Sequence, residues 1–171
     1  MSNKQDLRFI KTERLIISTY ISLKKQNQDP IKVSDLCTAA LINKSTFYAH
    51  YETMDELHRQ VCRQAISEML TEAPGNELLF TDTRKFVVSI VTTLQNNKEY
   101  LDILFNHDKI QEINAVEHYI LETRLYNIES ENRKMEFQFA ICGAARLLFN
   151  SQSEERIEKA IELIQKVLEI N

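Results

Sequence analysis

The chain has 171 residues, of which 43% are hydrophobic and 27% are charged, and it carries a formal net charge of −4. This composition is typical of a globular protein with a buried core, and it excludes an intrinsically disordered chain. No run of 18 apolar residues occurs in the sequence, so we expect no membrane-spanning segment.

Glycine and proline together account for only four residues. Hairpin turns and glycine-rich phosphate loops need these residues, so their scarcity predicts an all-α protein, with about nine helices. Basic residues gather at one end: residues 1–51 hold eight Lys/Arg against four acidic residues, a net charge of +4, whereas the remainder has a net charge of −8. A basic end on an acidic body favours docking on a phosphate backbone; chance asymmetry is the alternative.

Three cysteines, Cys37, Cys62 and Cys142, are odd in number and widely spaced. The start of the sequence, MSNKQDLRF, lacks the apolar core of a signal peptide. We therefore expect reduced thiols and a cytoplasmic location.

The first predicted helix covers residues 6–26 and carries an apolar stripe that includes Leu15, Ile16, Tyr20 and Leu23. We expect it to end before Pro30, because the residue before a proline is disfavoured in the helical region.

The next two predicted helices are short and lie about three residues apart. The first covers residues 33–40, where four apolar residues follow the helical spacing i, i+3, i+4 and i+7: Val33, Leu36, Cys37 and Ala40. The second covers residues 44–50 after Asn43, a good N-cap residue. Because a helix of two turns is marginal alone, we expect Phe47 and Tyr51 to anchor it in a core.

The outward face of this second helix is expected to hold Lys44, Ser45, Thr46, Tyr48 and Ala49. An ammonium group, hydroxyls and a phenol offer hydrogen-bond donors to phosphates and base edges. Two short helices joined by a tight turn predict a helix-turn-helix, whose second helix enters the major groove of DNA. A fourth helix follows over residues 54–71, with Thr53 and Glu56 as a capping box.

The segment INKSTFYAHYETMDEL, residues 42–57, closely resembles the DNA-binding motif of the TetR family of bacterial transcriptional regulators. The resemblance is strong over residues 31–57 and looser over the first helix, and beyond them it extends only to length and helical organisation. It implies an N-terminal three-helix DNA-binding bundle and a C-terminal helical bundle. It also implies a homodimer that binds a pseudo-palindromic operator in double-stranded DNA as a repressor, or alternatively an activator, controlled by a small-molecule effector.

The resemblance also implies individual site residues. In the family, the first residues of the recognition helix reach base edges, and nearby positions contact phosphates. The matching residues here are Ser34, Lys44, Ser45, Thr46, Tyr48 and His50. The chain departs from the family pattern at three positions: Leu41 replaces a turn glycine, Lys32 a capping Ser or Thr, and Met54 a phosphate-contacting lysine.

Pro74, Gly75 and Asn76 form the clearest break in the chain. We therefore predict three segments: a DNA-binding domain (1–52), a connector helix (53–73), and a domain for effector binding and dimerisation (74–171). Helices are predicted in the last segment over residues 82–96, 98–105, 110–128, 131–149 and 153–170, the first capped by Thr81 or Asp82 and the last by Ser153.

The resemblance places a ligand cavity among the helices after the connector. Candidate effector-pocket residues are Phe86, Ile90, Tyr100, Phe105, His118, Arg124 and Phe139, each with plain core or surface as the alternative. The resemblance, together with the apolar seam of the last helix, implies that the last two helices pair with those of a second copy, and Gly143 would permit close helix approach there. The predicted interface residues are Gly143, Ala144, Leu147, Ile157, Ile161, Ile164 and Leu168; close packing of Gly143 within one subunit is the alternative.

Other chemistry receives little support from the sequence. His58 and Cys62 are four residues apart and could share a metal with Cys37, but a helix face partly buried against the motif is the preferred explanation. The sequence contains no nucleophile elbow, Walker loop, HExxH or CxxC motif, so we expect no metal, no cofactor and no enzyme. The alternative function is a helical protein that acts mainly through a protein partner, which the replacement at Met54 keeps open.

Overall fold

A computed structural model of the chain describes residues 2–26, 30–150 and 152–168. Over these ranges it contains nine α-helices and two short 3₁₀ helices, with no strand, so the all-α prediction is confirmed. The α-helices are α1 (Ser2–Lys25), α2 (Val33–Ala39), α3 (Lys44–Tyr48), α4 (Met54–Thr71), α5 (Thr83–Asn96), α6 (Lys98–Leu104), α7 (Lys109–Arg124), α8 (Glu131–Asn150) and α9 (Glu154–Leu168). The 3₁₀ helices are η1 (Asn76–Leu78) and η2 (Leu125–Asn127).

The chain divides into two compact units, residues 1–62 and residues 63–171, which we call unit 1 and unit 2. The division falls inside α4, within the segment that the sequence predicts as a connector. In the part of the chain that the structure describes, both units contain helices and no strand. No helix of the described ranges combines the length and the apolar character needed to cross a bilayer.

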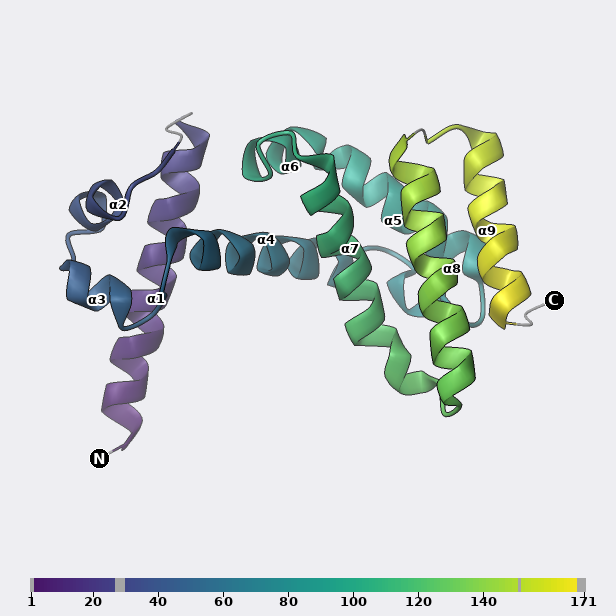
Figure 1. Ribbon diagram of the computed structural model, residues 1–171, viewed down its shortest axis with the longest axis horizontal. Coiled ribbons are helices and arrows are strands. Elements are labelled where there is room, and N and C mark those ends of the chain that lie inside the picture. The colour runs from purple at the N-terminus through teal and green to yellow at the C-terminus, as the bar shows by residue number, and fades with distance from the viewer. Residues whose placement is uncertain (1, 27–29, 151, 169–171) are drawn as a thin grey trace. The chain divides into compact units, whose positions relative to one another are not determined.

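In unit 1, α2 and α3 lie beside α1 (Figure 1). The core contribution of α1 comes from Ile16, Tyr20 and Leu23, which are buried at spacings of four and three residues. Leu15 is exposed, so its assignment to the inward stripe is wrong. It immediately precedes Ile16, and successive residues of a helix differ by about 100° in direction, so both cannot point to the centre of a narrow contact face.

Side-chain caps define where the helices begin. The amide of Glu56 donates to Thr53 Oγ1 at 3.1 Å, which confirms Thr53 as the cap of α4, while Glu56 Oε2 accepts from the amide of Glu52 rather than of Thr53. Asp82 caps α5 by accepting from the amide of Lys85 at 2.9 Å. Asn43 stands at the predicted N-cap of α3 but makes no side-chain capping bond.

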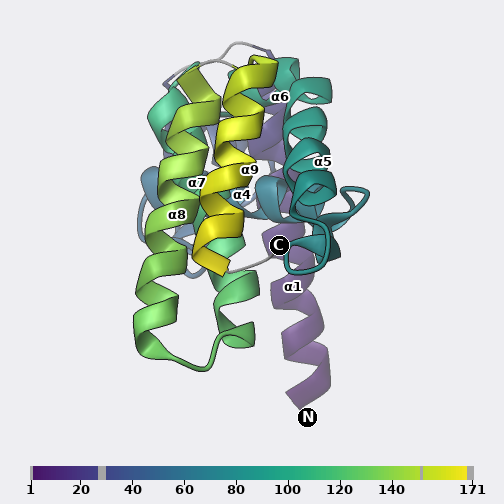
Figure 2. The same cartoon turned by 90° about the vertical axis from the view of Figure 1, so that its right-hand side faces the viewer.

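Unit 2 is built mainly from α5, α7, α8 and α9. Helix α8 packs against both α7 and α9 (Figure 1). Helix α9 also packs against α5 (Figure 2). The core between these helices is apolar, with buried Ile90, Val116, Ile141 and Ile164. Burial of branched side chains from four helices supplies the hydrophobic stabilisation of this unit.

Several predicted helix boundaries differ from the structure. The segment predicted as one helix over 110–128 begins at Lys109 and becomes 3₁₀ after Arg124. Its start is fixed by Asp108, whose carboxylate accepts from the amides of Ile110 and Gln111 at 3.0 and 3.1 Å. The predicted end of the last helix at Ile170 lies outside the described residues.

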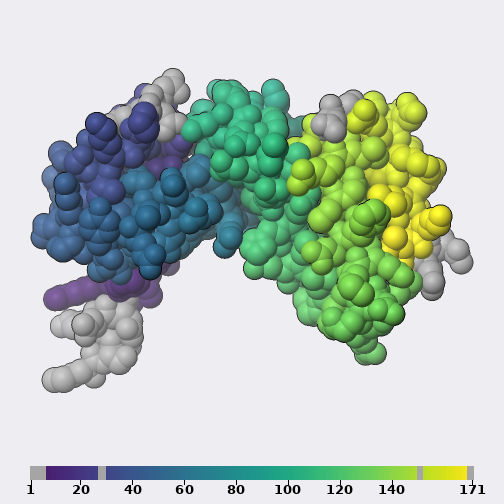
Figure 3. Space-filling view, viewed as in Figure 1, coloured from purple at the N-terminus to yellow at the C-terminus, as the bar shows by residue number. Residues whose placement is uncertain are grey.

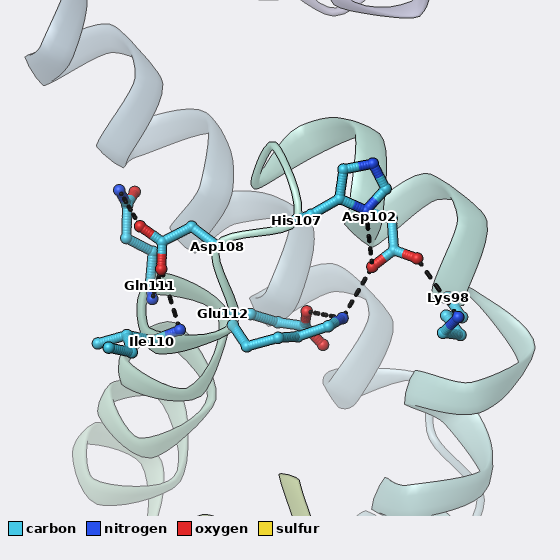
Figure 4. A network of polar contacts seen from close by, with 8 residues as sticks. Lys98, Asp102, His107, Asp108, Ile110, Gln111 and Glu112 are labelled. Carbon is cyan, nitrogen blue, oxygen red and sulfur yellow. Dashed lines mark hydrogen bonds and ion pairs between the residues drawn. The ribbon is translucent and has the colours of Figure 1, made fainter. Parts of the chain in front are cut away.

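The corner between α6 and α7 is held by a polar network (Figure 4). Lys109 Nζ donates to Asp102 Oδ1 at 2.8 Å and to Glu112 Oε2 at 2.7 Å. The two carboxylate side chains are only 15% and 6% exposed. The hydrogen bond from Lys109 lowers the pKa of Asp102. Burial would lower the pKa of Lys109, but its bonds to Asp102 and Glu112 outweigh this and raise it. One ammonium group thus stabilises two poorly hydrated carboxylates.

We expect Lys109→Met to lower the free energy of unfolding at pH 7 by about 1–2 kcal/mol, because it leaves two largely buried carboxylates without their shared cation. A carboxyl whose pKa is lowered on folding stabilises the fold above its unfolded pKa, and that stabilisation is lost as pH falls through the folded pKa. The difference between wild type and variant should therefore shrink below about pH 4. Urea unfolding measured at a series of pH values from about 7 down to about 2.5, which spans the pKa range of carboxyl groups, checks this prediction.

A matched control is Lys159→Met, since the exposed Lys159 also bonds a carboxylate, Glu162, at 2.8 Å. Its stability should equal that of the wild type. A loss for Lys109→Met that stays constant across the acid range would contradict the assigned role of Asp102.

Candidate functional site

The segment between α2 and α3 forms a tight turn over residues 40–43. The amide of Ile42 donates to the carbonyl of Cys37 at 3.0 Å, and the amide of Leu41 donates to Thr38 at 3.3 Å. Leu41 has a φ of 53°, in the left-handed region that favours glycine, and its side chain is 92% exposed. The turn therefore keeps the backbone conformation that glycine usually supplies, at a cost in strain for leucine.

Helix α3 is anchored by one aromatic residue. Phe47 is fully buried, and its ring lies 5.9 Å from the ring of the buried Tyr51. Both were predicted to point inward, and burial confirms this. Because Phe47 fixes the rotation of this short helix, Lys44, Ser45 and Tyr48 are left exposed, while Thr46 is half-buried.

Two further predicted site residues, Ser34 and His50, lie outside α3. Ser34, on α2, is exposed, and its hydroxyl donates to Asp35 Oδ1 at 3.2 Å. His50 is half-buried and stacks on Phe9 of α1, with ring centroids 3.9 Å apart and an interplanar angle of 24°. The sequence analysis did not find Phe9, although an aromatic residue outside the apolar stripe of α1 was the signal that could have drawn attention to it.

Burial governs the acid–base properties of unit 1. It raises the pKa of Cys62 to about 12, with a small opposing effect of Lys24, and it raises the pKa of Cys37, opposed by Lys44. Burial, aided by the carboxylate of Glu13, raises the pKa of Tyr51 to about 12. These groups are therefore neutral at pH 7.

The ring of His58 contacts two neighbouring side chains, those of Tyr20 and Cys62. Its Nδ1 is 2.9 Å from the hydroxyl of Tyr20, and Cys62 Sγ lies 3.6 Å from its Nε2. Among the residues that the structure describes, no group of three potential ligands is placed to hold a metal ion.

Unit 2 contains a small apolar cavity of about 40 Å³. It is lined by Phe86, Val87, Ile90, Val91, Leu94, Val116, Ile120, Ile141, Ala144, Ala145, Leu148, Phe149, Gln152 and Ile164. Engineered apolar cavities that bind benzene are about 150 Å³, so in this conformation the space is too small for a ring-sized ligand. Phe86 and Ile90, both predicted as pocket residues, do line it.

The other five predicted pocket residues lie elsewhere. Phe105 is buried in the core, Tyr100 is half-buried on α6, and His118 lies 3.1 Å from Glu122 on the same helix. Arg124 bonds main-chain carbonyls at the end of α7. Phe139 is 77% exposed, so its assignment to a pocket is wrong: its position on α8 points away from the core.

The predicted interface residues separate into two groups. Ala144, Ile161 and Ile164 are buried inside unit 2, so for these the interface prediction is wrong. The apolar seam of α9 packs against the helices of its own unit, which leaves no surface of those side chains for a second copy. Gly143 is exposed, while three others are half-buried: Leu147, Ile157 and Leu168.

The outer face of α8 carries apolar residues that the sequence analysis did not assign to an interface. Met135 and Phe139 are exposed, and together with Gly143 they lie at spacings of four residues along one face. Figure 3 shows that part of α8, in light green, lies on the surface of unit 2. The spacing of four from Gly143 is the signal that could have found them. A built Cβ on Gly143 lies 3.3 Å from Leu163 Cδ2 of α9, so the glycine also permits close approach within the unit.

Comparison of the chain with protein-family models, with curated proteins and with solved structures finds no match.

Proposed function

We propose that this chain is a TetR-like transcriptional regulator that binds a pseudo-palindromic operator as a homodimer and represses transcription until a small-molecule effector arrives. The observation that carries the proposal is the orientation of α3. Phe47 is fully buried, and the remaining surface of the helix presents Lys44, Ser45 and Tyr48 to solvent. A short helix held by one anchor, with donors along its free face, suits insertion into a major groove.

Each exposed group has a defined role in this proposal. Lys44, Ser45 and Thr46 begin α3, the part of a recognition helix that contacts base edges. Tyr48 and Ser34 offer hydroxyl donors to phosphates on either side of the groove. His50 is held against Phe9, so its ring is positioned before DNA arrives. Such prior ordering reduces the entropy that binding must remove.

The homodimer is supported by the exposed stripe of Met135, Phe139 and Gly143 on α8. Exposed apolar stripes on a helix favour association, since burial removes apolar surface from water. A two-fold dimer allows two copies of α3 to reach successive major grooves, about 34–36 Å apart. An effector lowers operator affinity only through its differential affinity for the two states of the dimer.

The test is a salt-dependent mobility shift with DNA selected from random duplexes, using wild type and the double variant Lys44→Ala, Tyr48→Phe. We expect sequence-specific binding by wild type and at least about tenfold weaker binding by the double variant. The variant loses the contact of Lys44 with a base edge or phosphate and the contact of Tyr48 with a phosphate. The same assay excludes the alternative of a protein that acts mainly through a protein partner.

The matched control is Lys98→Ala, Tyr126→Phe, which removes an exposed lysine and an exposed phenol from unit 2. It should bind the operator as wild type does. Equal affinity of wild type and the α3 double variant would refute the assignment of α3 as the recognition helix.

A further inference from the structure

The apolar cavity of unit 2 is long in proportion to its volume. Its lining residues on α5 run from Phe86 to Leu94, and those on α8 run from Ile141 to Phe149. Eight steps along a helix cover about 12 Å, because the rise is about 1.5 Å per residue. The volume is nevertheless only about 40 Å³. A space of this kind suits an unbranched chain better than a ring or a branched group.

The wall of the cavity decides which guest it favours. Every residue that lines it is apolar, with the exception of Gln152. A buried water molecule needs two to four polar partners, and an apolar cavity without them stays dry and accepts apolar guests. The side chains around an unfilled space also lack dispersion contacts on that side. A hydrocarbon chain that enters the cavity therefore gains both burial and contacts.

The cavity has one polar end, at Gln152. This residue is half-buried, and its Oε1 accepts from Nε2 of the exposed Gln95 at 2.6 Å. The pair joins the last turn of α5 to the residues before α9, so the cavity reaches the surface between two amide groups. Each amide offers both a donor and an acceptor, which suits a hydroxyl. None of the described residues that line the cavity is charged, so an ionic group inside it has no counter-charge.

We propose that this cavity binds a short, straight-chain aliphatic molecule with an uncharged polar end, such as a primary alcohol. The chain lies along the apolar wall, and the hydroxyl exchanges hydrogen bonds with the amides of Gln95 and Gln152. A water-sized group occupies about 10–15 Å³ by the same measure, so the cavity holds a chain of about three or four carbons. The role of this molecule as the effector rests on the proposed function, whereas its binding does not.

The experiment follows the methyl signals of Ile90, Ile141 and Ile164, which line the cavity, in protein labelled with ¹³C-methyl isoleucine. Each signal is assigned by its loss in an Ile→Val variant. The probes are 1-butanol, its branched isomer tert-butanol, and butyrate, which has a charged end. We expect 1-butanol to shift these signals saturably. Each methylene removed from the alcohol should weaken binding about fourfold.

The two other probes should cause no saturable shift. Because tert-butanol has the same atoms as 1-butanol, it reproduces any general effect of an alcohol on the protein and differs in shape alone. Equal responses to 1-butanol and tert-butanol, or signals that do not respond to 1-butanol, would overturn the proposal. Butyrate that binds as tightly as 1-butanol would also overturn it, because the cavity would then accept a charge.

Two neighbouring valines supply matched variants. Val87 is buried and lines the cavity, whereas Val88 is 41% exposed. Val87→Leu should fill the space and lose the 1-butanol response, while Val88→Leu should keep it. If Val87→Leu fails to fold, the comparison of the two butanols in the wild type still decides, since it needs no variant. A folded Val87→Leu that binds 1-butanol as the wild type does would contradict the assigned site.

Failure of the site and failure of the proposed function give different results. Binding of 1-butanol in the cavity of a protein that binds no DNA sequence leaves the site in place and refutes the regulator. Operator binding by a protein whose cavity methyl signals ignore 1-butanol refutes the site alone.

Discussion

Phe47→Ala is expected to lower the free energy of unfolding of unit 1 by about 3–5 kcal/mol, the range for removal of a buried phenylalanine side chain. Phe47 is fully buried and contacts the rings of Tyr48 and Tyr51. Helix α3 has only five residues, and a helix so short depends on tertiary packing. Hydrogen exchange resolved by segment should show faster exchange over residues 33–51, and operator binding should be lost.

The neighbouring variant Tyr48→Ala is the control. Tyr48 is exposed, so its removal should leave exchange in unit 1 near the wild-type rate and reduce DNA affinity only. If Phe47→Ala bound the operator with wild-type affinity, the burial of Phe47 would not be what orients α3.

Gly143→Leu is expected to convert the proposed dimer to monomer at micromolar concentration while leaving helix content intact. A leucine at the proposed helix crossing forces the subunits apart, and each overpacked site costs about 1–3 kcal/mol, counted twice in a two-fold interface. Within one unit the residue is exposed, and its Cβ would touch only the end of Leu163 at 3.3 Å. Replacing a mid-helix glycine also removes a helix-propensity cost of about 1 kcal/mol.

Sedimentation and a thermal melt of Gly143→Leu decide whether Gly143 lies between two subunits or in a tight contact within one subunit. We expect a monomer that keeps its helix content, melts cooperatively, and loses only the stability that association contributes to the wild type. Gly143→Ala, which adds one methyl group, should remain dimeric. A Gly143→Leu protein that melts lower but stays dimeric would place the tight contact inside one subunit and refute the interface.

Local signals allowed much of the fold to be predicted from sequence. Scarce glycine and proline, together with apolar spacing of three and four residues, predicted an all-α chain, and the capping residues Thr53, Asp82 and Ser153 marked three helix starts. The burial of Phe47 and Tyr51 followed from their spacing and from the need of a short helix for an anchor.

The tertiary contacts of individual side chains were harder to predict from the sequence. Ile161 and Ile164 form an apolar seam, but spacing cannot tell whether a seam faces its own unit or a second copy, and both residues are buried within unit 2. Phe139 was predicted as a pocket residue because the resemblance places a cavity among these helices, whereas its position on α8 points outward. The pairing of Arg124 with Asn76 joins residues 48 positions apart, which no local pattern predicts.

The raised pKa values of the three thiols have a consequence for redox chemistry. Thiolates, rather than thiols, attack alkylating agents and peroxides, so Cys37 and Cys62, buried in unit 1, are protected while that unit is closed. Cys142 belongs to unit 2 and is the most accessible of the three. Modification of the first two by a maleimide therefore requires unit 1 to open. The rate at which a maleimide modifies Cys37 and Cys62 therefore reports the rate at which unit 1 opens, and no label has to be introduced into the chain.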